Sequence, residues 1–166
     1  MSSVSHPSSA KRSAWLVAAG AAFVVAALGG WITDVGPWYQ ALEKPAFNPP
    51  DWLYAPAWTV IYGLCVLAAV FGWRASRTSK VRAWLMTLFF FNAALNILWS
   101  ALFFTFRRPD WALAQVITLW LSVLALVVFF ARFSPRSSAL LLPYLAWVSF
   151  AAYLNYQIVV LNGPFS

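Results

Sequence analysis

Five long stretches of the chain contain no charged residue, and shorter polar segments separate them. They cover about residues 13–33, 52–73, 83–106, 111–131 and 138–161. Each is as long as the roughly 20 residues that an α-helix needs to cross the hydrocarbon core of a bilayer. Strands of a membrane β-barrel would be about half as long and would alternate polar and apolar residues. The pattern predicts an all-α integral membrane protein, a bundle of five transmembrane helices in one domain that spans residues 13–166.

The first twelve residues are polar and rich in serine, and they end in Lys11 and Arg12. We interpret residues 1–12 as a disordered tail. A cationic segment before an apolar one is also typical of a cleaved signal peptide. The apolar stretch that follows here is longer than the 7–15 residues of a signal peptide core, so we expect a retained first helix.

Lysine and arginine are distributed unevenly between the polar segments. The N-terminal tail and segments 74–82 and 132–136 together hold eight of the 11, whereas segments 34–51 and 107–110 hold three. The positive-inside rule then predicts a cytoplasmic N-terminus and an external C-terminus, in a membrane such as the bacterial inner membrane. The net charge of +7 comes mainly from these cations between the apolar segments. Because the cations flank apolar segments, the charge does not indicate a nucleic-acid partner.

The composition limits the chemistry that the chain can perform. Hydrophobic residues make up 63% of the chain and charged residues 9%, against roughly 25% charged in a soluble domain. The five apolar stretches hold no ionisable Asp, Glu, Lys, Arg or His, which proton-coupled transport and acid–base hydrolysis usually require. With one cysteine and one histidine, the chain is expected to form no disulfide, no metal site and no obligatory cofactor site.

Aromatic and amide residues recur at helical spacing inside the apolar stretches. Three faces result: Trp58, Tyr62 and Cys65; Asn92, Asn96, Trp99 and Phe103; and Tyr144, Trp147, Ala151 and Asn155. The amides Asn92 and Asn96 need partners inside the bundle. Two interpretations stay open: hydrogen bonds that hold helices together, or polar contacts in an aromatic-lined cavity for a flat ligand.

The first apolar stretch contains small residues four positions apart, namely Ala22, Ala26 and Gly30. Small residues let transmembrane helices approach closely. This stripe predicts either the seam of a homodimer or close packing within one bundle.

Several of these residues belong to short motifs. The segment after the first stretch reads Trp38-Tyr39-Gln40-Ala41-Leu42-Glu43-Lys44-Pro45 and then Asn48-Pro49-Pro50. Later motifs are Trp58-Thr59, Ala94-Leu95-Asn96 and Pro143-Tyr144-Leu145-Ala146-Trp147. Together these motifs resemble the TspO/MBR family, the tryptophan-rich sensory proteins and translocator proteins, over nearly the whole chain after the N-terminal tail.

The resemblance implies a five-helix bundle whose ligand cavity is covered by the first interhelical loop and binds porphyrins such as protoporphyrin IX. The residues that match family pocket positions are Trp38, Tyr39, Trp58, Tyr62, Asn92, Asn96, Trp99, Trp111, Trp147 and Ala151. The cholesterol motif of the animal proteins ends in a Lys or Arg late in the fifth helix. Arg136 is the last charged residue here, so high-affinity sterol binding at that motif is not expected.

Three functions are compatible with this resemblance. The first is a membrane sensor or regulator that binds a tetrapyrrole such as protoporphyrin IX. The second is an enzyme that degrades porphyrin with light and oxygen, for which Trp58 and Trp147 would be the reactive pair. The third is a transporter of porphyrins or lipids. The expected partners are a small hydrophobic ligand, the lipid bilayer and a second copy of the chain.

Overall fold

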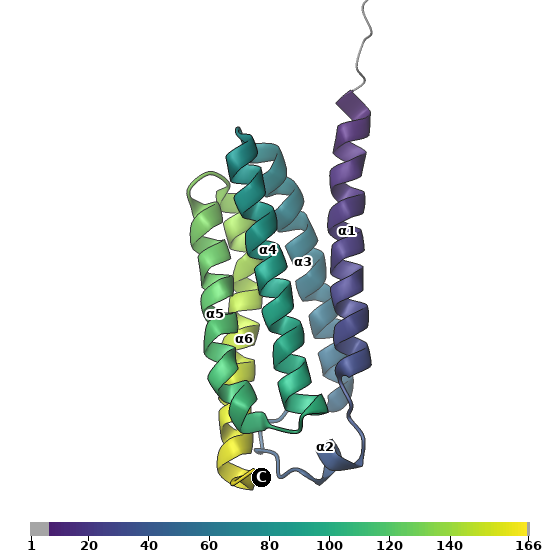
Figure 1. The fold of residues 1–166 in the computed structure, drawn as a ribbon, viewed down its shortest axis with the longest axis vertical. Helices are drawn as coiled ribbons and strands as arrows, with labels where there is room; N and C mark the ends of the chain where they lie inside the picture. The colour runs from purple at the N-terminus through teal and green to yellow at the C-terminus, as the bar shows by residue number, and fades with distance from the viewer. Residues whose placement is uncertain (1–6, 166) are drawn as a thin grey trace, which may run out of the picture.

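The structure, a computed structural model, describes residues 7–165, and all regular structure within that range is helical (Figure 1). The helices are α1 (Pro7–Ile32), α2 (Pro37–Ala41), the 3-10 helix η1 (Asp51–Leu53), α3 (Tyr54–Ala75), α4 (Ser79–Ser100), the π-helix η2 (Ala101–Thr105), α5 (Pro109–Ala131) and α6 (Pro135–Asn162). Four spans are long and apolar enough to cross a membrane: Asp51–Ala75, Ser79–Thr105, Pro109–Ala131 and Pro135–Asn162. Helix α1 adds the shorter apolar segment Ala18–Ile32, so the expected five-helix membrane bundle is confirmed.

The first helix begins earlier than the sequence pattern predicts. Residues 7–12, expected to be disordered, form the first turns of α1, while residues 1–6 of the predicted tail lie outside the described residues. Proline suits a first helical turn because its missing N–H would be unpaired there in any case. A turn that extends beyond the bilayer needs no apolar surface, and for this reason the hydrophobic pattern did not reveal it.

Local signals mark the other helix starts. Pro37, Pro109 and Pro135 occupy the first turn of α2, α5 and α6. Thr78 caps α4, because its Oγ1 accepts a hydrogen bond from the backbone N–H of Val81 at 3.2 Å. This bond satisfies one of the N–H groups that a helix leaves unpaired at its N-terminus.

Helices α3 to α6 form the body of the bundle, and α1 packs against the side formed by α3 and α4 (Figure 1). The most extensive helix contact is between α5 and α6. The core contains Ile61, Val116, Leu119, Val123 and Val148, all nearly inaccessible to solvent. In Figure 1, α1 diverges from α3 and α4 toward its N-terminus.

The small-residue stripe of α1 faces the bundle only in part. Ala22 and Ala26 are half-buried, and Gly30 is exposed. At Gly29, next to the stripe, an added Cβ would lie 3.9 Å from the hydroxyl of Tyr62, so α1 approaches α3 closely there. Close packing within one bundle thus accounts for part of the stripe, and a homodimer stays a prediction.

Helix α3 contains two glycines in opposite environments, which yields a test of the packing. A Cβ on buried Gly72 would overlap the ring of Phe130, itself fully buried, whereas a Cβ on exposed Gly63 would meet nothing within 4 Å. We expect Gly72→Ala to lower the free energy of unfolding by about 2 kcal/mol through overpacking. Gly63→Ala, in the same helix, should leave the thermal unfolding midpoint in detergent unchanged or raise it. Equal midpoints for the two variants would contradict this packing.

Candidate ligand-binding site

A chain of hydrogen bonds crosses the middle of the bundle. Asn92 Nδ2 donates to Ser122 Oγ at 2.8 Å, and Tyr144 OH donates to Asn92 Oδ1 at 3.2 Å. Asn96 Nδ2 donates to Tyr144 OH at 3.3 Å, and Tyr62 OH donates to Asn96 Oδ1 at 3.4 Å. We call these five residues the polar chain. They join α3, α4, α5 and α6, so both amides hold helices together as one of the two interpretations expected.

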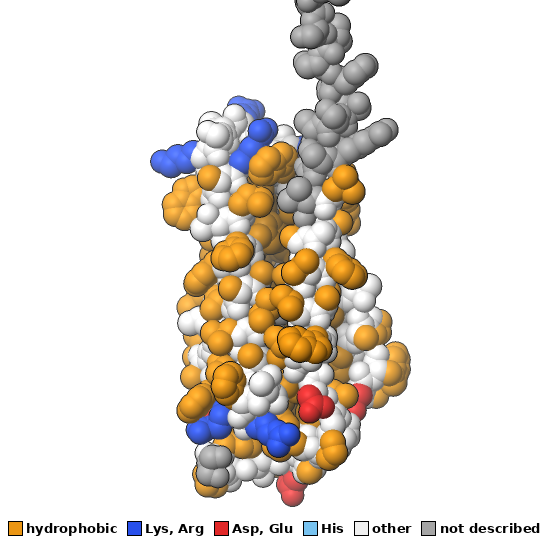
Figure 2. Space-filling model, turned by 45° about the vertical axis from the view of Figure 1, so that its right-hand side comes forward, with side chains coloured by type: hydrophobic (Ala, Val, Ile, Leu, Met, Phe, Trp, Pro, Cys, Tyr) orange, Lys and Arg blue, Asp and Glu red, His pale blue; other side chains and the backbone are white. Residues whose placement is uncertain are grey.

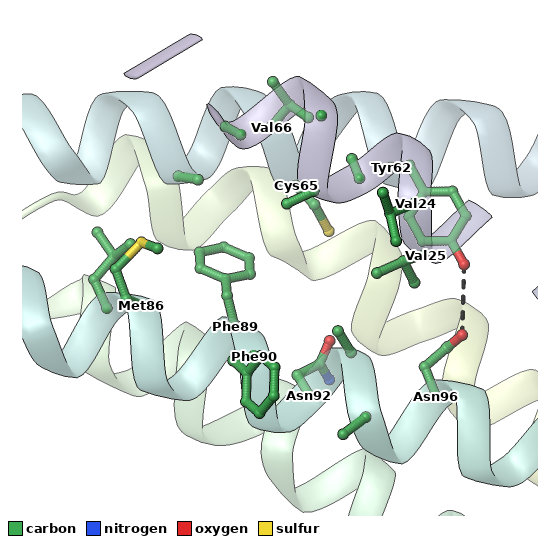
Figure 3. Close-up of a pocket in the computed structure, with 18 of the residues that line it drawn as sticks. Val24, Val25, Tyr62, Cys65, Val66, Met86, Phe89, Phe90, Asn92 and Asn96 are labelled. Atoms are coloured by element: carbon green, nitrogen blue, oxygen red, sulfur yellow. Dashed lines mark hydrogen bonds between the residues drawn. The ribbon is translucent and has the colours of Figure 1, made fainter. Parts of the chain in front are cut away.

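A cavity of about 690 Å³ lies beside the polar chain, between α1, α3 and α4 (Figure 3). Its walls are largely apolar and include Val24 and Val25 of α1, Val66 of α3, and Phe89 and Phe90 of α4. Every member of the polar chain except the serine also lines it. The amides therefore combine the two expected roles: they link helices, and they place polar atoms along an apolar cavity.

The cavity differs from the aromatic-lined one that the sequence led us to expect. Tyr62, Asn92 and Asn96 are the predicted site residues that line it. Cys65 and Met86 also line it, and Figure 3 shows their sulfur atoms in the same view. The sequence reasoning missed the contribution of α1. Its only signal was the stripe of small residues, of which Ala22 lines the cavity.

Two further predicted residues, Trp58 and Trp147, pack against each other instead of lining the cavity. Their ring centroids are 6.4 Å apart in an edge-on arrangement, and Trp58 also stacks on Tyr62 at 5.3 Å. Trp147 contacts the rings of Tyr54 and Phe150. Tyr62 and Tyr144, which lies edge-on to Trp58 at 6.2 Å, thus connect this aromatic cluster to the cavity.

The first loop packs onto the end of the bundle through Trp38 and Tyr39. Trp38 meets Phe103 edge-on with ring centroids 6.2 Å apart, and buried Tyr39 lies 5.7 Å from Phe104. Both phenylalanines belong to the π-helix η2, a widened turn of the kind often found near functional sites. Burial raises the pKa of the Tyr39 phenol, and the negative charge of Asp51 raises it further.

The loop is also fixed to the last turn of α6. Asn162 Oδ1 accepts a hydrogen bond from the backbone N–H of Glu43 at 2.8 Å, and its Nδ2 donates to the carbonyl of the same residue at 2.8 Å. Phe47 stacks on Tyr153 with ring centroids 5.4 Å apart. These contacts hold the loop across one end of the bundle, and none of its described residues lines the cavity. Asn162 was not singled out from the sequence.

The remaining predicted residues lie away from the cavity. Trp111 is 52% exposed, and its ring lies 4.3 Å from the guanidinium carbon of Arg108, which forms an ion pair with Asp110. Trp99 stacks on Phe103, and its buried Nε1 has no hydrogen-bond partner among the described residues. Ala151 is half-buried in α6. The structure therefore does not bring Trp111 together with the other predicted site residues.

Tyr144 is the member of the polar chain whose hydroxyl can be removed with little change of side-chain volume. We expect Tyr144→Phe to lower the free energy of unfolding by about 1–2 kcal/mol, because Asn92 and Asn96 each lose a partner in a buried setting. Tyr156→Phe is the matched control in the same helix, since Tyr156 is 50% exposed, and it should have no effect. Thermal unfolding in detergent measures both; an unaffected Tyr144→Phe would mean that the polar chain does not stabilise the bundle.

Comparison with known proteins fits this architecture. The TspO/MBR family matches residues 17–161. The "Tryptophan-rich protein TspO" of Chlorobaculum tepidum is 40% identical over 129 residues, which cover 75% of this chain and 79% of that protein. The "Translocator protein" of Sus scrofa is 35% identical over 149 residues, which cover 86% and 88%. The "Tryptophan-rich sensory protein" of Cereibacter sphaeroides is 37% identical over 127 residues, which cover 75% and 77%. This chain belongs to the TspO/MBR family.

Proposed function

We propose that this membrane protein is a sensor that binds a tetrapyrrole of the protoporphyrin IX type in the cavity between α1, α3 and α4. The observation that supports this most directly is the cavity itself, about 690 Å³ with apolar walls and a few polar atoms from the polar chain. Such a site suits a large flat ligand that is mostly hydrophobic. A relative named a tryptophan-rich sensory protein supports the sensory role.

The position of α1 suggests how ligand binding would be sensed. Among its described side chains, none forms a hydrogen bond to another helix, whereas the polar chain joins α3 to α6. A ligand in the cavity would contact α1 on one side and α3 and α4 on the other. Binding would therefore change the position of α1, and with it the first loop, which follows α1 directly.

The proposal also includes an orientation. The N-terminus and the turns after α3 and α5 would lie in the cytoplasm of a bacterial-type inner membrane, and the first loop would lie outside, because the turns carry most of the cations.

Filling the cavity tests the site. Ala69 lines the cavity on α3, so Ala69→Phe should place a ring in the space that the ligand needs. We expect protoporphyrin IX to bind at least about tenfold more weakly, as measured by quenching of tryptophan fluorescence. Ala114→Phe adds the same ring at an exposed position of α5 and should bind like the unmodified protein. Equal affinities in the two variants would rule out this cavity as the site.

A second candidate function, light-dependent porphyrin degradation, is favoured by the contact between Trp58 and Trp147. Indole rings are readily oxidised, and Trp58 stacks on Tyr62, a residue of the cavity wall. A reactive species formed at a bound porphyrin would therefore find two indoles close by.

Bleaching under illumination separates degradation from binding alone. If the tryptophan pair takes part, Trp58→Phe/Trp147→Phe should slow the loss of protoporphyrin absorbance several-fold. Trp31→Phe/Trp52→Phe removes two tryptophans that are 84% and 71% exposed and should bleach at the unmodified rate. Bleaching no faster than in detergent without protein would exclude degradation as a function of the site.

A further inference from the structure

The two ends of the bundle differ in charge. One end, which we call the basic end, carries Arg74, Arg77, Lys80 and Arg82 at the turn between α3 and α4 (Figure 2). The four carboxylate residues of the chain all lie toward the opposite end: Asp34, Glu43, Asp51 and Asp110. The cations of the basic end therefore have no carboxylate of this chain near them.

Two of these arginines contact aromatic rings at the basic end, and one of those rings lines the cavity. Trp73 lines the cavity, and the guanidinium carbon of Arg82 lies 5.1 Å from its ring centroid. Arg74, the next residue along α3, has its guanidinium carbon 5.8 Å from the ring centroid of Trp15 on α1. These two contacts place positive charge from α3 and α4 at the end of the bundle where α1 diverges from both helices (Figure 1).

The opposite end of the cavity offers no comparable cation. The hydrogen bond between Tyr62 and Asn96 crosses that end (Figure 3). Three cations lie beyond it: Lys44 and Arg107, over the rings of Tyr39 and Trp38 in the first loop, and Arg108, which is paired with Asp110. The rings that these three cations contact do not line the cavity, whereas Trp73, which Arg82 contacts, does. The cation that directly contacts the cavity wall therefore belongs to the basic end.

We propose that Arg74 and Arg82 bind the acidic groups of an amphipathic ligand whose apolar body occupies the cavity. The ligand then lies with its acidic edge toward the basic end and enters between α1 and α4. Guanidinium groups form paired, charge-assisted hydrogen bonds with carboxylates, and both arginine side chains are exposed. One Nη of Arg82 donates to the carbonyl of Ser76 at 3.4 Å, and the other donors of its guanidinium remain for a ligand. This inference rests on the proposed function, because it specifies the charge and the orientation of the same tetrapyrrole ligand.

Protoporphyrin IX and its dimethyl ester provide the test, because they share the ring system and differ in their two carboxylates. The measurement is fluorescence quenching with each ligand in Arg74→Gln/Arg82→Gln. We expect affinity for the diacid to fall about tenfold, the size of a charge-assisted interaction, and affinity for the diester to stay unchanged. In the unmodified protein the diacid should bind more tightly than the diester.

A control variant separates this contact from the general charge of the basic end. Arg77→Gln/Arg132→Gln removes the same charge from the same end, but neither side chain lies over an aromatic ring that lines the cavity. Arg132 directly follows α5, which lies on the far side of the bundle from α1 (Figure 1). We expect this variant to bind the diacid like the unmodified protein. Equal losses in both double variants, or equal losses for diacid and diester, would overturn the proposal.

One further outcome points elsewhere in the molecule. If Arg107→Gln weakened diacid binding and Arg74→Gln/Arg82→Gln did not, the acidic edge would face the first loop and the proposed orientation would be wrong. If the unmodified protein bound neither porphyrin, the proposed function would fail, independently of the arginines.

Discussion

The polar chain from Tyr62 to Ser122 determines how this bundle is organised. Inside a bilayer no water is available to the two asparagines, so their amides are stable only where other helices supply partners. Tyr144 meets this requirement by bonding to both of them. Because α3, α4, α5 and α6 each contribute a member, their relative positions are fixed by directional bonds. Helix α1 contributes none, and among its described side chains packing contacts, not hydrogen bonds, hold it against α3 and α4.

The difference between α1 and the hydrogen-bonded helices α3 to α6 explains where the cavity lies. Close packing without hydrogen bonds holds α1 near α3 around Gly29, and the helices separate toward the basic end. On the other side of the polar chain, the space between the helices is filled by the rings of Trp58, Trp147 and Tyr54, and the first loop covers them. The bundle therefore has a tightly packed aromatic half and a half that remains open beside α1.

Features that depend on local sequence were predictable, and features that depend on the position of α1 were not. The apolar length of each span follows from bilayer thickness, and the shared face of Asn92 and Asn96 follows from helical spacing. The start of α1 at Pro7 escaped notice because a helix outside the bilayer leaves no hydrophobic pattern. Trp111 was assigned to the pocket by resemblance, yet it precedes buried Ala112 on α5 and points outward under Arg108.

The contact between Asn162 and Glu43 has a consequence for the order in which the protein assembles. The two residues are 119 positions apart in the sequence. At a synthesis rate of about 5–20 residues per second, the first loop emerges roughly 6–24 seconds before its partner exists. During that interval α2 and the segment around Phe47 have no anchor on α6. Closure of the loop over the bundle is therefore among the last events of biogenesis, and ribosome-bound chains that stop before residue 162 will expose this segment to proteases that the finished protein resists.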